Sequence, residues 1–175
     1  MKKLLLFTFL IMTAMVNAQT TCATATTVSS NGTLTTPTYA TSTFSAGCAA
    51  NKTGIRAIWY KYTPASNGEI TISSDLAANN GTTYTNDTRI SVFKGTCTQL
   101  QCVGYNDDVS ATNYKSSVTI PVAAGTTYYF QWDNYWNVGT STANLALQFT
   151  FDFTAASCIR PSAFEFFLPE NYSTT

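Results

Sequence analysis

The chain has 175 residues, with nine basic and nine acidic side chains, no histidine and a charged fraction of only 10%. Its polarity comes from 32 Thr, 15 Ser and 13 Asn residues, and 14% of the residues are aromatic. Without a basic excess a nucleic-acid partner is not expected. The lack of histidine excludes His-based catalysis and His-ligated zinc, and the aromatic content argues against general disorder. A β-rich binding or structural module remains.

Residues 1–18 have the layout of a secretory signal peptide. Lys2 and Lys3 form a positive start, an apolar run covers positions 4–16, and Ala18 offers a small residue for cleavage. The run is too short for a membrane anchor, which needs roughly 20 apolar residues. We therefore expect residues 1–18 to be removed and the remainder to be secreted or held at the cell surface, with no membrane span.

The strands are expected in chain order between turn-forming segments, about eight in all. They are predicted at 33–40, 55–63, 69–76, 89–94, 100–105, 116–122, 126–132 and 143–153. The last strand is the clearest, because alternate residues share one apolar face: Leu145, Leu147, Phe149, Phe151 and Phe153. No segment has a helical period.

Short strands with one apolar face predict an all-β fold, a two-sheet antiparallel β-sandwich. The two apolar faces should meet, and the outer faces should be exposed to water. We expect one domain at residues 19–157, because a chain of this length buries enough surface for a single core. Trp59, Tyr60 and Tyr62 should belong to a strand with one side in that core.

All five cysteines follow the predicted signal peptide, and an oxidising compartment favours disulfides. Cys97 and Cys102 flank a short segment, which suggests a bond across a tight hairpin. Cys22 and Cys48 would then hold the N-terminal segment. Four cysteines allow three pairings, however, and the sequence does not choose among them. Cys158 is left over, and the CxxC pairs typical of zinc sites are absent.

Residues 87–149 resemble the bacterial pre-peptidase C-terminal domain and its jelly-roll relatives. The likeness rests on an order of motifs: a strand from Asp87 to the Val-Phe-Lys-Gly turn at 92–95, an Asn-Asp-Asp loop at 106–108, and the strand at 125–133 that ends in Trp-Asp. The resemblance implies a non-catalytic accessory β-sandwich of the kind often appended to secreted enzymes or adhesins.

Residues 158–164, Cys-Ile-Arg-Pro-Ser-Ala-Phe, are similar to the opening of a fibronectin type III repeat. In exported proteins of the Bacteroidetes type, such repeats often follow a domain of this kind. We therefore expect 158–175 to be a linker or the truncated start of a fibronectin type III-like domain. Further domains, with the partner of Cys158, would lie downstream.

Calcium is the first candidate ligand, because hard cations prefer several carboxylate and carbonyl oxygens. Asp107 and Asp108 share one loop, and Asp87 opens a strand that a hairpin would bring alongside them. Asp133 could join from another loop. The alternative is that the Asn-Asp-Asp segment only forms a turn, with its side chains bonded to their own backbone.

An aromatic platform is the second candidate site. Tyr135 and Trp136 lie in a polar segment, with Asp133 as a polar neighbour, and exposed rings of this kind stack on sugars or on protein partners. The alternative is a loop that folds back to cap the sandwich.

The expected function is a secreted or cell-surface accessory module for adhesion or for binding a glycan or protein, and not an enzyme. The sequence contains no well-placed acid pair for sugar cleavage, no G-x-S-x-G elbow and no phosphate-binding glycine loop. The alternative is a structural spacer with no ligand of its own. A binding module should have an aromatic or concave surface with converging polar groups, whereas a spacer should be polar all round.

Overall fold

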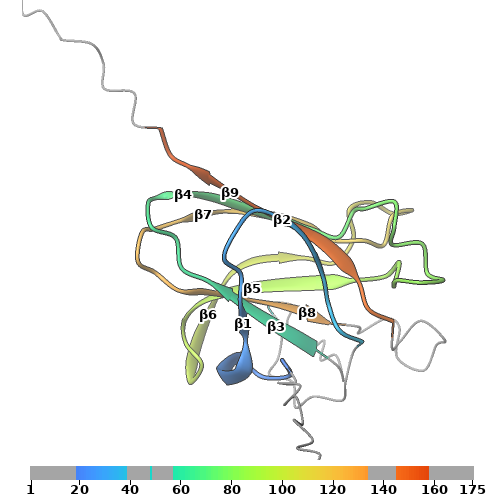
Figure 1. Cartoon of the computed structure of the whole chain (residues 1–175), viewed down its shortest axis with the longest axis horizontal. Helices are drawn as coiled ribbons and strands as arrows, with labels where there is room; N and C mark the ends of the chain where they lie inside the picture. Colours follow the sequence, from blue (N-terminus) through green and yellow to red (C-terminus); the bar gives the residue numbers. More distant parts are fainter. Residues whose placement is uncertain (1–18, 39–47, 49–56, 134–144, 158–175) are drawn as a thin grey trace, which may run out of the picture.

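The computed structural model describes residues 19–38, 48, 57–133 and 145–157 (Figure 1). A short 3-10 helix, η1 (Cys22–Thr24), precedes the strands. The nine strands are β1 (Thr26–Thr27), β2 (Gly32–Thr35), β3 (Ala57–Tyr62), β4 (Gly68–Ser73), β5 (Arg89–Thr96), β6 (Gln99–Asn106), β7 (Ser117–Val122), β8 (Tyr128–Asp133) and β9 (Gln148–Ala155). The predicted signal peptide and the predicted fibronectin-like segment lie outside the described residues.

The strands form two sheets that pack as a sandwich, which confirms the all-β prediction. The order is β1-β3-β8-β5-β6 in the first sheet, called sheet A here, and β2-β9-β4-β7 in the second, called sheet B. Every pairing is antiparallel except that of β1 with β3. Without β1, the two orders are those of an eight-stranded jelly roll. The eight predicted strands are all present, and β1 is the addition.

The main core lies between the sheets and follows from the period-two alternation of the strands. Leu147, Phe149 and Phe151 of the predicted apolar face are fully buried. Phe130, on β8, packs against Phe149 and Phe151 with ring centroids 6.1 and 5.9 Å away. Each such ring gains roughly 2–3 kcal/mol from leaving water, so this core holds the two sheets together.

Part of the outer face of sheet A is buried, so the expectation that this whole face would be exposed to water is wrong. Trp59 and Phe93 project from this face and stack with ring centroids 5.6 Å apart. They belong to a second apolar cluster with Cys22 and Ala25. The cause is the N-terminal segment, which docks on β3: the backbone N–H of Trp59 donates to the carbonyl of Gln19 at 2.7 Å.

Two disulfides hold the segments that contact this outer face. They join Cys22 to Cys97 and Cys48 to Cys102. The suggested pairing of Cys97 with Cys102 is therefore wrong. Cys102 is paired in register with Phe93, whereas Cys97 lies in the turn between β5 and β6. Each of these two cysteines bonds to a segment from earlier in the chain instead of to the other strand of its own hairpin.

The sandwich has two unlike ends. At one end, called the short-turn end here, the strands are joined by the segments 28–31, 63–67, 97–98 and 123–127. At the other, called the long-loop end, the connections are 36–56, 74–88, 107–116 and 134–147. Figure 1 shows the 74–88 connection extending well beyond the strands. Among the described residues, no helix has the length and hydropathy needed to cross a bilayer.

Candidate functional site at the long-loop end

Arg89 and Asp133 form a buried ion pair at this end of sheet A. β5 begins at Arg89 and β8 ends at Asp133, and the antiparallel register places the two residues opposite each other. Arg89 Nε donates to both carboxylate oxygens of Asp133, at 3.0 and 2.8 Å, and both side chains are fully buried. Asp133, predicted to contact a ligand, therefore faces Arg89 beneath the surface.

The three aspartates of the calcium hypothesis come together beside this pair. Asp87 precedes β5 and Asp107 follows β6, and these neighbouring strand ends lie side by side because Ile90 pairs with Asn106. Burial raises the pKa of Asp87 to about 6, with further contributions from the negative charges of Asp108, Asp107 and Asp133. The repulsion shows that the carboxylates are electrostatic neighbours.

Proximity of these carboxylates does not amount to a formed metal site. In the described part of the chain, no group of three or more His, Cys, Asp or Glu side chains is arranged to hold a metal ion. The pKa of nearby Tyr105 is raised to about 12 by burial and by Asp107. The calcium site at Asp87, Asp107 and Asp108 stays a prediction.

The connection between β6 and β7, called the 107–116 loop here, is held at its base and along its length. Asn106 accepts a hydrogen bond from the N–H of Ser117 at 2.9 Å, and Ser116 Oγ donates to the carbonyl of Asp107 at 2.6 Å. The N–H of Val109 donates to the carbonyl of Lys115 at 2.7 Å. Because its own polar groups are bonded to one another, the loop has a defined shape.

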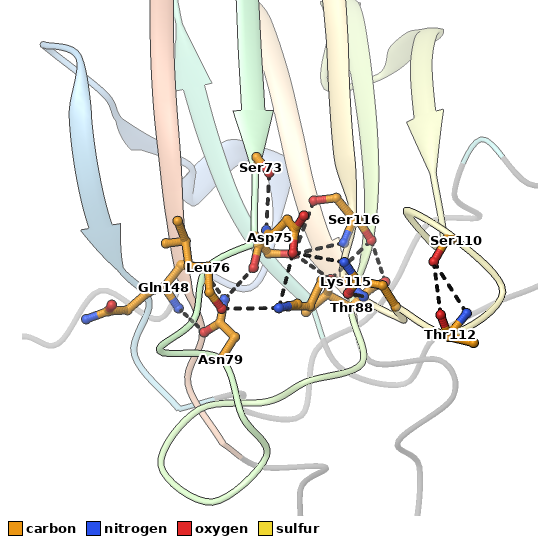
Figure 2. A network of polar contacts seen from close by, with 12 residues as sticks. Ser73, Asp75, Leu76, Asn79, Thr88, Ser110, Thr112, Lys115, Ser116 and Gln148 are labelled. Carbon is orange, nitrogen blue, oxygen red and sulfur yellow. Dashed lines mark hydrogen bonds and ion pairs between the residues drawn. The ribbon is translucent and has the colours of Figure 1, made fainter.

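The same loop is bonded to its neighbours at the rim (Figure 2). Lys115 Nζ lies 3.1 Å from Asp75 and donates to the carbonyl of Leu76 at 3.3 Å. Asn113 donates to Asp75 at 2.9 Å. These hydrogen bonds, first from Asn113 and then from Lys115, hold the pKa of Asp75 below its ordinary value.

Asn79 and Ser74 attach the 74–88 connection to β9 and to the 107–116 loop. The amide of Asn79 donates to the carbonyls of Ser74 and Gln148, at 2.6 and 2.7 Å, and its oxygen accepts from the N–H of Gln148 at 2.9 Å. Ser74 Oγ lies 2.7 Å from Thr88 Oγ1 in a buried hydroxyl cluster with Ser116. The described parts of two long connections are thereby joined into one rim.

Two large hydrophobic side chains stand out from this polar rim. Tyr114 is 51% exposed and Val109 is 42% exposed, and they are the only exposed large hydrophobics among the described residues. Tyr114 is fixed through its backbone, because its carbonyl accepts a hydrogen bond from Thr88 N–H at 2.9 Å. The sequence analysis missed both residues. The only signal was a tyrosine and a valine within a segment rich in turn-forming residues.

The predicted aromatic pair, Tyr135 and Trp136, lies outside the described residues. Both follow Asp133 directly in the chain. The described part of this end therefore offers hydrogen-bonding groups, an excess of carboxylates and one exposed aromatic ring.

Comparison with known proteins adds no family to this description: no family model matches the chain, and no curated protein matches it.

Proposed function

We propose that this chain is a secreted or cell-surface, non-catalytic accessory β-sandwich whose long-loop end binds an extracellular glycan or protein. The observation that carries the proposal is the 107–116 loop, which exposes Val109 and Tyr114 while hydrogen bonds hold its backbone. Exposed apolar side chains rimmed by polar groups mark interaction sites. A tyrosine held in place gives a large contact at small entropic cost.

Export is supported by two independent features. Residues 1–18 have the pattern of a signal peptide, and the two disulfides need an oxidising compartment to persist. The resemblance of residues 87–149 to pre-peptidase C-terminal domains supports an accessory role within a larger exported protein. A structural calcium ion at Asp87, Asp107 and Asp108 is part of the same proposal.

The alternative is a structural spacer that binds nothing. A spacer should be polar all round, and most of the described surface is. Val109 and Tyr114 are the exception, and they lie on the same short loop. This exception favours the binding module over the spacer.

Binding arrays test the proposal. The full chain, produced in an oxidising secretory compartment, is applied to arrays of extracellular glycans and proteins beside Tyr114→Ala, Trp136→Ala and the control Lys94→Ala at the short-turn end. We expect the wild type and the control to share a ligand that Tyr114→Ala or Trp136→Ala binds about tenfold less well, as for a central aromatic contact. Equal binding of one ligand by all four forms would overturn the role given to Tyr114 and Trp136, and no ligand for any form would leave the spacer as the better explanation.

A further inference from the structure

Gln19 is the residue that signal-peptide cleavage after Ala18 would leave at the N-terminus, and the structure holds it against sheet A. Its carbonyl accepts a hydrogen bond from the backbone N–H of Trp59, on β3, at 2.7 Å. The disulfide of Cys22 fixes the chain only three residues later. Cys22 and Trp59 belong to the same apolar cluster on the outer face of this sheet. The new N-terminus would therefore be docked on the sandwich from its first residue.

The side chain of Gln19 ends in a carboxamide that the fold does not use. The residue is half-buried, and its Oε1 is buried without a hydrogen-bond partner in the described part of the chain. A buried acceptor without a donor costs about 1–3 kcal/mol, so the folded state gains nothing from keeping the oxygen there. The carboxamide can turn toward the backbone nitrogen of its own residue without breaking a hydrogen bond made by this oxygen.

Cleavage after Ala18 would also create an α-amino group at this docked position. An α-amino group is mostly protonated, and so charged, at neutral pH. Beside the apolar cluster of Trp59 and Cys22, a charged end group would lose part of its hydration, which disfavours it. A neutral end group would suit this position better, and an N-terminal glutamine can form one from its own side chain.

We propose that Gln19 becomes the N-terminal residue of the exported protein and is converted there to pyroglutamate, so that a neutral lactam ends the segment that covers sheet A. The unprotonated α-nitrogen attacks the side-chain carbon Cδ, the bond from Cδ to Nε2 breaks, and ammonia leaves with the proton that the nitrogen gives up. The five-membered ring forms within one residue, so the attack is intramolecular and needs no other reactant. The inference rests on the export part of the proposed function and adds a modification site to it.

The lactam would protect the covering segment as well as neutralise it. Aminopeptidases remove residues from a free amino end, and pyroglutamate has none. The residues that such enzymes would remove first lead directly to Cys22, whose disulfide and apolar contacts hold the cover over Trp59. The modification would therefore preserve the burial of this face in the extracellular space.

Mass spectrometry of the exported protein tests the inference. The full chain, including residues 1–18, is produced in an oxidising secretory compartment, kept at neutral pH for several days, reduced and digested with trypsin. The N-terminal peptide should then run from Gln19 to Lys52. We expect it to be lighter than its sequence by one molecule of ammonia, with fragment spectra placing the loss at Gln19. Edman degradation of the denatured protein should give no sequence until pyroglutamyl peptidase has removed the first residue.

Two variants with the same chemical change provide the comparison. Gln19→Asn keeps a carboxamide but could close only a strained four-membered ring, so it should lose no ammonia and should give a readable sequence. Gln99→Asn, at an exposed internal position, should keep the blocked N-terminus. We also expect the N–H of Trp59 to exchange with solvent several-fold faster in Gln19→Asn than in Gln99→Asn, because a charged end group docks less well on β3.

The other outcomes separate the inference from the proposed function. A protein that begins at Gln19 with a free amine would overturn the modification and leave export standing. A protein that begins at another residue would overturn the inference at its first step, and one that keeps residues 1–18 would also contradict export. Equal exchange of the Trp59 N–H in the two variants would overturn the role given to the lactam in docking. If Gln19→Asn is not exported, Gln19→Ala provides the second variant.

Discussion

The two ends of the sandwich differ in the length of their connections and in how those connections are held. At the short-turn end every connection within the described chain is brief, and turn chemistry closes it: Gly125 adopts a φ of 72°, and its N–H donates to the carbonyl of Pro64 at 2.9 Å. At the long-loop end the connections are two to several times longer, and side chains fix their described parts. Long connections on a rigid scaffold are where proteins place binding residues. The short-turn end is thus closed by brief turns, and the long-loop end is the one at which we propose that a ligand binds.

The largest effect on stability is expected from breaking the buried ion pair between Arg89 and Asp133. Arg89→Met leaves the carboxylate of Asp133 buried without its cation, so the free energy of unfolding should fall by about 3–5 kcal/mol. The matched change Lys94→Met, at the exposed end of the same strand, should cost less than about 0.5 kcal/mol. Urea unfolding of both variants measures the difference. Equal losses would mean that the ion pair does not organise the long-loop end.

Removing the first disulfide should have the next largest effect. Replacing Cys22 and Cys97 together by serine releases a covalent closure between residues 75 positions apart. A loss of about 2–4 kcal/mol is expected, mainly because the unfolded chain regains freedom. Thermal unfolding with and without reductant checks this: reductant should lower the Tm of the wild type more than that of the double variant. A double variant as stable as the wild type would show that docking of the N-terminal segment needs no covalent help.

The hydrogen bonds that hold the rim together are tested by replacing Asn79. Asn79→Ala removes its three hydrogen bonds and leaves the buried carbonyl of Ser74 and the half-buried carbonyl of Gln148 without that donor. The expected loss is about 1–3 kcal/mol, with faster amide exchange in 74–88. The adjacent Asn80→Ala, at an exposed position where the side chain accepts hydrogen bonds from Thr82, should cost clearly less than Asn79→Ala, because the groups that it leaves unpaired can bond to water. If the two variants behave alike, the long connection is held by something other than Asn79.

A smaller effect is expected from pH. Because the pKa of Asp87 is raised from 3.8 to about 6, the folded protein binds its proton more tightly than the unfolded chain does. Stability should therefore fall by about 1 kcal/mol as the pH rises from about 4 to about 6, and then level off, after allowance for the solvent screening of a half-exposed group. Asp87→Asn should remove this slope. Asp75, with its lowered pKa, acts only below this window.

Adding calcium to the measurement of stability against pH tests the predicted calcium site. An ion held by Asp87, Asp107 and Asp108 would favour their ionised forms, raise the Tm at neutral pH and flatten the slope between about pH 4 and pH 6. Asp108→Asn should reduce the gain. A Tm that does not change when calcium is added would show that the sequence-based calcium hypothesis is wrong.

The strands were predictable from the sequence because period-two alternation is a local property. All eight predicted segments contain a strand, and Leu147, Phe149 and Phe151 face the core as expected. The covering of sheet A was not predictable. Of the strand residues Trp59, Tyr60 and Tyr62, only Tyr60 and Tyr62 face the main core, whereas Trp59 lies in the second cluster with Cys22 and Ala25. Which segment crosses which face is a matter of tertiary structure, without a signature in the strands.

The candidate site was predicted in part for the same reason. Asp87, Asp107 and Asp108 meet because they flank neighbouring strands, and hairpin connectivity predicts that. The exposure of Tyr114 and Val109 depends on a loop without any periodic pattern, which is oriented by hydrogen bonds from Thr88 N–H to the Tyr114 carbonyl and from Val109 N–H to the Lys115 carbonyl. The predicted disulfide between Cys97 and Cys102 was wrong because proximity in sequence does not show which other segments of the chain lie next to each cysteine in the fold.

The bond between Cys22 and Cys97 also governs how the protein would respond to mechanical tension. A pull on the two ends of the described chain passes through this bond, so the 75-residue stretch between the two cysteines, with β1 to β5, is bypassed. Only β6 to β9 can be drawn out while the sulfurs stay joined. Reduction of both disulfides would release about 250 Å of additional contour length, at roughly 3.4 Å per residue, whereas the bond between Cys48 and Cys102 keeps its own 54-residue stretch closed while it stays intact. The N-terminal cover of sheet A therefore limits how far a stretched molecule can extend.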